Sequence, residues 1–500
     1  MALPALALLA LVLACSDDAD PMGSMDATTP PSDARSMRDD GIDESRPDLA
    51  VSETGPDEGP PPVDAGSDAA PTAGAAVACA ERSVEIARAA GTIIEVSPAG
   101  PGQVNVDGAT RSLRQVVSSA STGDTILLAD GTYTFPNGGG FTGLYFTTPG
   151  ITLRSASGDA SAVILDSAYQ DHGNGSAPIT VAAADTVLAD FTVQRSIYHL
   201  IHLWADGDNA LVHNVTMIDG GQQFLKASPG GDARVDDAEI SCSRFEMTDE
   251  GRDNVWGYGR QGGNTTCYTG GIDAHDSRNW HVHDNVFNGI YCNPDGVQRP
   301  AHGMNPDARG GQTYRGGLSE HAIHMWDSEE GTGHLIERNR IYNCARGIGL
   351  GFRVDTYGTI IRNNTIFSAF AGGREHDVGI SVERAHDTSI LNNTIFYASG
   401  SAYSSTIEFR FPSTDNVEIR NNLTNQRIRS RDDANAAMSA NVTDARSEWF
   451  VDAESGDLRL ARCDVDSVVE AGDSSSDVSD DIDGLPRTGA MDIGADQCSE

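Results

Sequence analysis

The chain has 500 residues, of which 34 are lysine or arginine and 73 are aspartate or glutamate, giving a formal net charge of -39 at pH 7. An acidic surface repels the phosphate backbone of nucleic acids, so we expect no nucleic-acid partner. It also disfavours a polyanionic glycan, unless a cation or a local basic group intervenes.

The first residues, MALPALALLALVLACSDD, contain an apolar run of about a dozen residues that ends at Cys15. The run is too short to span a membrane as a helix and has the length typical of a signal peptide. VLAC (12–15) resembles a bacterial lipobox, in which the cysteine is lipidated, although no Lys or Arg precedes it and Leu13 is larger than usual. We predict a lipoprotein signal peptide over 1–15, lipidation of Cys15 and anchoring to the envelope of a Gram-negative bacterium. The alternative is an ordinary signal peptide and secretion.

Residues 16–78 are rich in Asp, Pro, Ser, Gly and Ala and almost free of aromatic residues. Such a segment cannot bury enough apolar surface to offset the entropy lost on ordering. We therefore predict a disordered acidic tether over 16–78.

The rest of the chain repeats an Asn-rich phrase followed by an apolar strand. The copies are HNVTM (213–217), HDNVF (283–287), RNRIY (338–342), NNTIF (363–367 and 392–396) and NNLTN (421–425). Asn339, Asn364, Asn393 and Asn422 are separated by 25, 29 and 29 residues. This period is typical of a parallel β-helix, in which the inward Asn of one coil bonds to the Asn of the next. A β-sandwich or propeller is the alternative, but it would need hairpin turns that are not the dominant punctuation here.

The segment that opens the repeats, SLRQVVSSASTGDTILLADGTYT (112–134), has apolar residues at helical spacing and then a strand. It resembles the N-terminal cap of secreted right-handed β-helix proteins of the pectate-lyase-like class, including the chondroitinase B and alginate lyase type. GLPRTGAMDIGADQ (484–497) resembles a closing segment of the same architecture. The resemblance implies an all-β fold, a right-handed parallel β-helix with an N-terminal helical cap. We place the β-helix at 79–440 and its closing segment at 441–500. The class hosts lyases, hydrolases, epimerases and binding proteins, so the resemblance is specific for the fold and weak for activity.

Stacking the coils aligns seven short strands: IHLW (201–204), LKAS (225–228), IDAH (272–275), IHMW (323–326), IGLG (348–351), ISVE (380–383) and IEFR (407–410). If their Ile and Leu residues face the core, the alternate residues face outward, with neighbouring coils about 4.8 Å apart. One outward column, the site column, is His202, Lys226, Asp273, His324, Gly349, Ser381 and Glu408. The second column is Trp204, Ser228, His275, Trp326, Gly351, Glu383 and Arg410.

Lys226 is the only lysine of the chain, and the stacking places it beside Asp273. Lysine can release a proton when its surroundings lower its pKa, whereas arginine effectively cannot. Mixed charges on adjacent coils are typical of functional sites. The long insertions at 250–269 and 293–319 fall beside these coils, and we expect them to wall a groove. A solvated lysine retained by chance is the alternative.

This arrangement favours a polysaccharide lyase that cleaves a uronate-containing glycan by β-elimination. Lys226 is the candidate base, and His324 or His275 the candidate acid. The uronate carboxylate would be held by Asp273 with a bound cation such as calcium, or by Arg346 and Arg353. Further candidate substrate contacts are Trp204, Trp326, His202, Glu320 and His321. The resemblance implies a Lys or Arg base and often calcium, but the full ligand sets of such lyases are not matched here.

Two other functions stay open. A non-catalytic glycan-binding or adhesive protein needs only the groove and the tryptophans. A glycoside hydrolase needs two carboxylates around one bond, and Asp273 is the only one in the central coils. Glu320-His321 and His281-x-His283 have the residue types of metal ligands, although such pairs are more often plain polar strand edges. We expect a polysaccharide partner, a membrane contact only through the lipid, and a monomer.

The chain has eight cysteines, which in an exported protein suggest disulfides. Without Cys15, seven remain. We predict the pairs Cys242–Cys267, Cys292–Cys344 and Cys463–Cys498, with Cys79 free or substituting for one partner.

Replacing Cys15 with Ser removes the thiol that would carry the lipid. We expect the protein to move from the membrane fraction to the soluble fraction after cell breakage. Unchanged partitioning of the Cys15→Ser variant would contradict lipidation at this position.

Overall fold

The computed structural model describes residues 73–88, 91–136, 142–170, 177–253, 257–259, 265–267, 269–292, 318–372 and 375–498. The chain divides into two compact units, Met1–Asp64 and Ala65–Glu500, and every described residue lies in the second. The signal peptide with Cys15, most of the predicted tether and most of the two insertions therefore lie outside the described residues. None of the helices in the described part of the chain has both the length and the apolar character needed to cross a membrane.

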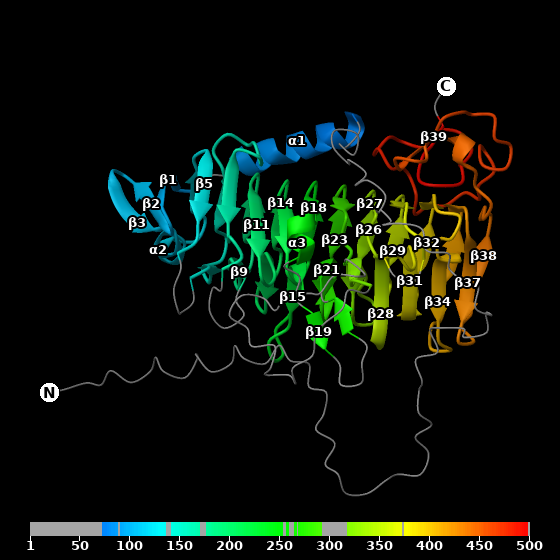
Figure 1. Ribbon diagram of the computed structural model, residues 1–500, viewed down its shortest axis with the longest axis horizontal. Helices are drawn as coiled ribbons and strands as arrows, with labels where there is room; N and C mark the ends of the chain where they lie inside the picture. Colours follow the sequence, from blue (N-terminus) through cyan, green and yellow to red (C-terminus); the bar gives the residue numbers. More distant parts are fainter. Residues whose placement is uncertain are drawn as a thin grey trace, which may run out of the picture. The chain divides into compact units, whose positions relative to one another are not determined.

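The second unit is built from three long sheets, and the chain passes from one sheet to the next in each coil (Figure 1). Sheet 1 contains, in order, β3 (Ala109–Ser112), β2 (Gln103–Val106), β1 (Ile93–Gly100), β4 (Thr125–Leu128), β7 (Thr152–Ser155), β10 (Val187–Ala189), β13 (Leu211–His213), β17 (Glu239–Ser241), β23 (His281–His283), β26 (Leu335–Glu337), β29 (Ile360–Arg362), β32 (Ser389–Leu391), β35 (Glu418–Arg420) and β38 (Ala437–Ser439). Sheet 2 contains β5 (Gly131–Thr134), β8 (Val163–Asp166), β11 (Thr192–Ser196), β14 (Thr216–Gly220), β18 (Arg244–Glu246), β24 (Val286–Asn288), β27 (Arg340–Tyr342), β30 (Thr365–Ser368), β33 (Thr394–Tyr397) and β36 (Leu423–Thr424). Sheet 3 contains β6 (Leu144–Phe146), β9 (Ile179–Val181), β12 (Ile201–Trp204), β15 (Gln223–Ser228), β21 (Gly270–Ala274), β25 (His321–Met325), β28 (Arg346–Tyr357), β31 (Ile380–His386), β34 (Ser405–Arg410) and β37 (Arg427–Arg431).

Pairing between successive coils is parallel in all three sheets, which confirms the right-handed parallel β-helix that the sequence predicts. Antiparallel pairing occurs at β1–β2–β3 and in two small hairpins. The hairpins are β19 (Gly257–Gly259) with β20 (Thr265–Cys267) and β39 (Phe450–Asp452) with β40 (Asp457–Leu460). A short parallel pair joins β16 (Val235–Asp236) to β22 (Ser277–Arg278).

The helices lie outside the coils. The cap helix that the sequence predicts is α2 (Leu113–Ser119), whose Ser112 side chain accepts a hydrogen bond from Gln115 N, as an N-cap does. α1 (Ala73–Arg88) includes the last residues of the predicted tether and packs Ile86 against Ala189 and Leu211. The remaining helical elements are α3 (Asp249–Asp253) and the short 3-10 helix η2 (Ser447–Trp449).

Asparagines at the bend between sheets 1 and 2 form the predicted ladder. Asn339 donates to Asn364, Asn364 to Asn393, and Asn393 to Asn422, each from Nδ2 to Oδ1 over 3.0 Å. Each Oδ1 also accepts the backbone N–H of the preceding ladder residue. The residue before each ladder Asn has positive φ, a conformation that Asn and Asp tolerate better than most residues, and the chain has Asn at 363, 392 and 421.

The C-terminal segment folds back along sheet 2. Its residues Phe450, Leu458 and Val468 pack against Tyr342, Phe367, Phe396 and Leu423 of β27, β30, β33 and β36 (Figure 1). The segment thus covers an apolar outer face of the solenoid.

The disulfides differ in part from those predicted. Cys463–Cys498 is confirmed. Cys242 bonds to Cys79 and Cys344 is a buried free thiol, so the predicted pairs Cys242–Cys267 and Cys292–Cys344 are wrong. The reason is that α1 brings Cys79 to the turn after β17, a contact between residues 163 positions apart that no local pattern indicates.

We expect Asn393→Ala to lower the free energy of unfolding by at least about 2 kcal/mol, because it leaves buried amide groups of two coils without partners. Urea unfolding followed by circular dichroism measures the change. The matched control is Asn105→Ala, at an exposed position of β2, for which we expect a change within about 0.5 kcal/mol. Equal effects of the two substitutions would contradict a structural role for the ladder.

Candidate functional site

Sheet 3 carries the predicted site column in the predicted register. His202 pairs with Lys226, Lys226 with Asp273, and Asp273 with His324 on β12, β15, β21 and β25. The column continues through Gly349, Ser381 and Glu408 on β28, β31 and β34. Alternation explains the placement: Ile201, Leu225, Ile272 and Ile323 are fully buried in the core, and the residues that follow them project from the other face.

The side chains of the site column are more buried than expected for residues on the outer face of a solenoid. The exposed fraction of the side chain is 8% for Lys226, 5% for Asp273 and 7% for His324, compared with 27% for His275. His275 is therefore the most exposed of these four side chains.

Lys226, Asp273, His275 and His324, which we call the lysine cluster, are in mutual contact. Lys226 Nζ donates to Asp273 Oδ2 over 2.6 Å and to His275 Nε2 over 2.8 Å. His275 Nε2 lies 3.3 Å from the same carboxylate oxygen, and His324 Nδ1 lies 3.5 Å from Asp273 Oδ1. Three residues, Lys226, His275 and His324, therefore share the carboxylate of Asp273.

The carboxylate of Asp273 is ionised in this setting. Burial by itself would raise its pKa, but the charge of Lys226, and then His275 and His324, hold the pKa of Asp273 well below its ordinary value. A buried carboxylate needs a compensating charge, and the ammonium group of Lys226 supplies it.

His324 has a defined tautomer. Its Nε2 lies 3.0 Å from the carbonyl oxygen of Gly351, which can only accept, so Nε2 carries the proton. Nδ1 of the same ring lies 3.5 Å from Asp273 Oδ1.

The predicted aromatic contacts lie on the second column and pack against histidines. The Trp204 ring lies edge-on to His202, with ring centroids 5.1 Å apart. Trp326 contacts both His275 and His324, at 4.7 and 5.2 Å between centroids. Both tryptophans are half-buried.

Arginines predicted to hold a carboxylate are not brought to the cluster by the described structure. Arg346 lies 3.4 Å from Asp377 and contacts the carbonyl of Ser319. The side chain of Arg353 lies outside the described residues. The more distant carboxylates are also paired: Glu383 binds Arg410, and Glu408 binds Arg431.

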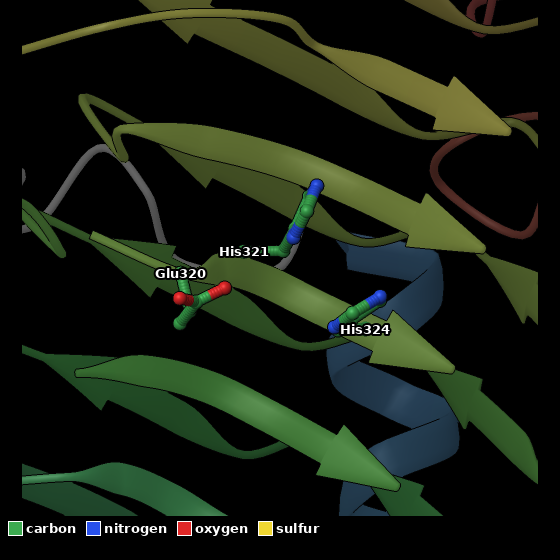
Figure 2. A group of neighbouring side chains, drawn as sticks. All are labelled: Glu320, His321 and His324. Atoms are coloured by element: carbon green, nitrogen blue, oxygen red, sulfur yellow. The ribbon is translucent and has the colours of Figure 1, made fainter. Parts of the chain in front are cut away.

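Glu320, His321 and His324 lie close together at the start of β25 (Figure 2). One ligand atom from each lies within 4.8 Å of the other two. This is the only such group of three or more among the described residues, and it does not include Asp273. Calcium takes six to eight oxygen ligands, and this group offers the oxygens of one carboxylate and two nitrogens. Calcium at Asp273 stays a prediction, and no group of three His, Cys, Asp or Glu side chains among the described residues includes Asp273.

Sequence reasoning missed His199. Its Nδ1 donates to the carbonyl of Gln223 over 2.9 Å, and its ring lies 5.3 Å from that of His202. Burial, followed by the neighbouring His202 and Lys226, holds the pKa of His199 well below its ordinary value. The signal was its position three residues before His202, on the bend that enters β12.

No family model and no curated protein matches this sequence. Among solved structures, pectate lyase Pel9A superposes with a TM-score of 0.55 at 16% identity, covering 83% of this chain and 98% of that chain. A PL6 alginate lyase in complex with a trisaccharide follows, with a TM-score of 0.37, 13% identity and coverage of 73% of this chain and 83% of that one. The PL6 family polysaccharide lyase Pedsa3628 from Pseudopedobacter saltans superposes with a TM-score of 0.34 at 12% identity, covering 74% of this chain and 96% of that chain. The likeness to Pel9A shows a shared fold, and the two weaker superpositions carry no argument.

We expect Asp273→Asn to destabilise the protein by about 3 kcal/mol at pH 7, because it leaves the buried charge of Lys226 without a partner. The folded-state pKa of Asp273 is depressed, so the stability that it contributes is present above its unfolded pKa of about 3.9 and is lost as pH falls further.

The difference in free energy of unfolding between wild type and Asp273→Asn should therefore be constant from pH 7 to pH 5 and shrink below about pH 4. Denaturant unfolding at several pH values measures it. A difference that is independent of pH over this range would contradict an ion pair as its source.

Proposed function

We propose that the protein is a polysaccharide lyase that cleaves a uronate-containing glycan by β-elimination at the lysine cluster. The observation that carries the proposal is the contact of Lys226 with both Asp273 and His275 on one face of a parallel β-helix. The fold shared with pectate lyase Pel9A supports it, because that scaffold is compatible with such chemistry. Buried ionisable groups in a mixed cluster support a functional rather than a stabilising role.

β-Elimination breaks the C5–H and C4–O bonds and forms a C4–C5 double bond. The negative charge that develops on the uronate carboxylate must be stabilised, and a base must take the C5 proton. Since Lys226 already binds the carboxylate of Asp273 in the free protein, we assign it to the carboxylate of the substrate. The sequence predicts instead that Lys226 is the base, and the comparison of Lys226→Arg with Lys226→Ala below tests that role.

His275 is the candidate base. Its Nε2 lone pair is held by Lys226 over 2.8 Å in the free protein and becomes available when the ammonium group turns to a substrate carboxylate. Its greater exposure supports direct contact with the glycan. The proton that it takes can then pass to the leaving oxygen, so electrons and protons balance without a further reagent.

Two rival functions make different use of the site. A glycan-binding protein is supported by the half-buried side chains of Trp204 and Trp326 on the second column. A hydrolase is less supported, because Glu408 lies four coils from Asp273, about 19 Å, whereas paired catalytic carboxylates lie within about 10 Å. Glu320, the carboxylate nearer to Asp273, is grouped with two histidines.

The setting of the reaction is part of the proposal. We propose that the protein is exported and anchored through lipidated Cys15. The disulfides Cys79–Cys242 and Cys463–Cys498 support an oxidising compartment.

The test is ultraviolet absorbance of the unsaturated product, measured with polygalacturonate, alginate and hyaluronate as substrates. On a cleaved glycan, we expect Lys226→Ala to lower kcat/KM by at least about 100-fold. Lys226→Arg keeps the charge, so it should retain activity within about tenfold of wild type if Lys226 acts on the carboxylate. Loss equal to that of alanine would assign the base role to Lys226.

The matched control is Asp284→Asn, which disturbs another buried carboxylate, paired with Arg338 at a bend remote from the cluster. It should leave kcat/KM within about threefold of wild type, in keeping with a remote structural change. Reducing ends without ultraviolet absorbance would indicate a hydrolase, and binding without either signal a glycan-binding protein. Full activity of Lys226→Ala would refute the proposed site.

A further inference from the structure

Glu320, His321 and His324 form a group that shares His324 with the lysine cluster but contains no lysine (Figure 2). Glu320 precedes β25, and His321 and His324 lie on it. Figure 2 shows the three side chains on the same side of this strand, with the Glu320 carboxylate directed toward the two rings. Ligand atoms from one short segment thus converge within 4.8 Å.

The atoms that converge are acceptors. His324 Nε2 donates to the carbonyl of Gly351, which leaves Nδ1 as the lone pair of the neutral ring. His321 Nε2 lies 3.4 Å from Ser381 Oγ, while its Nδ1 is buried and has no hydrogen-bond partner among the described residues. A buried polar atom without a partner costs about 1–3 kcal/mol. A bound cation would satisfy these lone pairs.

The backbone makes room for this arrangement at Gly349. A Cβ at this position would lie 2.6 Å from His321 Nε2, which is closer than any real contact. The ring of His321 therefore rests on the bare backbone of β28, beside the ring of His324 at 4.7 Å between centroids. Glycine in the site column is explained by the position of this ring.

The charge beside the group also suits a cation. Asp273 Oδ1, which is buried and has no hydrogen-bond partner among the described residues, lies 3.5 Å from His324 Nδ1 and adds negative potential.

We propose that Glu320, His321 and His324 form a binding site for a divalent transition-metal ion, with zinc as the best match. Two imidazoles and one carboxylate form a ligand set that suits zinc and its neighbours, whereas calcium prefers an all-oxygen set. The hydrogen bond from His324 Nε2 to a backbone carbonyl is the usual support of a ligating histidine. Three protein ligands leave a position for water or for an oxygen of a bound molecule.

The inference does not rest on the proposed lyase function, since metal binding is measured without glycan. The test uses the full chain without a histidine tag, stripped of metal with a chelator and dialysed. Cobalt(II) is titrated and followed by its visible absorption, and zinc is titrated by calorimetry. We expect one equivalent of each ion to bind, and zinc to displace cobalt.

We expect His321→Gln and Glu320→Gln each to weaken binding by at least about tenfold. The matched control is His281→Gln, which alters the other close histidine pair, His281 and His283, whose ring centroids are 3.9 Å apart. It should leave binding of the first equivalent unchanged. Gly349→Ala keeps all three ligands but displaces the His321 ring, and it should weaken binding as well.

Circular dichroism confirms that each variant is folded. If His321→Gln does not fold, metal binding by Glu320→Gln and Gly349→Ala tests the proposal in its place. The proposal is refuted if the wild-type chain binds neither ion stoichiometrically. It is equally refuted if the folded site variants bind as wild type does, or if His281→Gln abolishes binding.

Discussion

Parallel pairing between successive coils is the constraint on which the rest of this structure depends. Each residue of a sheet 3 strand faces one residue of the next coil, so Lys226 meets Asp273 although 47 positions separate them. The asparagine ladder holds the bend of each coil in the same register. The register is kept on both sides of the two insertions, between β15 and β21 and between β21 and β25.

The same constraint places charged groups in a buried position, where they are costly. Removing Lys226 and Asp273 from water costs several kcal/mol for each ion, and their mutual attraction offsets this cost only with good geometry. At 2.6 Å, with His275 as a further partner, the geometry is good, but a pair of apolar residues would have been at least as stable. Stability alone therefore does not account for the pair.

Two groups of opposite character meet at Asp273 and His324. On one side of the carboxylate, Lys226 donates hydrogen bonds. On the other side, His324 Nδ1, His321 and Glu320 present lone pairs. His324 belongs to both groups, so a cation bound on the acceptor side would change the electrostatic surroundings of Asp273 and, through it, of Lys226. The column thus joins a donor site and an acceptor site within two coils.

The sequence by itself determined the fold, the ladder and the membership of both columns, because these follow from a repeat of 25 to 29 residues and the alternation of side chains along a strand. It also indicated the cap helix and Cys463–Cys498, whose partners are close in the chain. Only the tertiary structure decided that the site column is buried, that Cys79 bonds to Cys242, and that Arg346 turns to Asp377. It also brought the His321 ring over Gly349. These features depend on contacts between groups distant in sequence and on the space that each side chain leaves for the next, which periodicity does not encode.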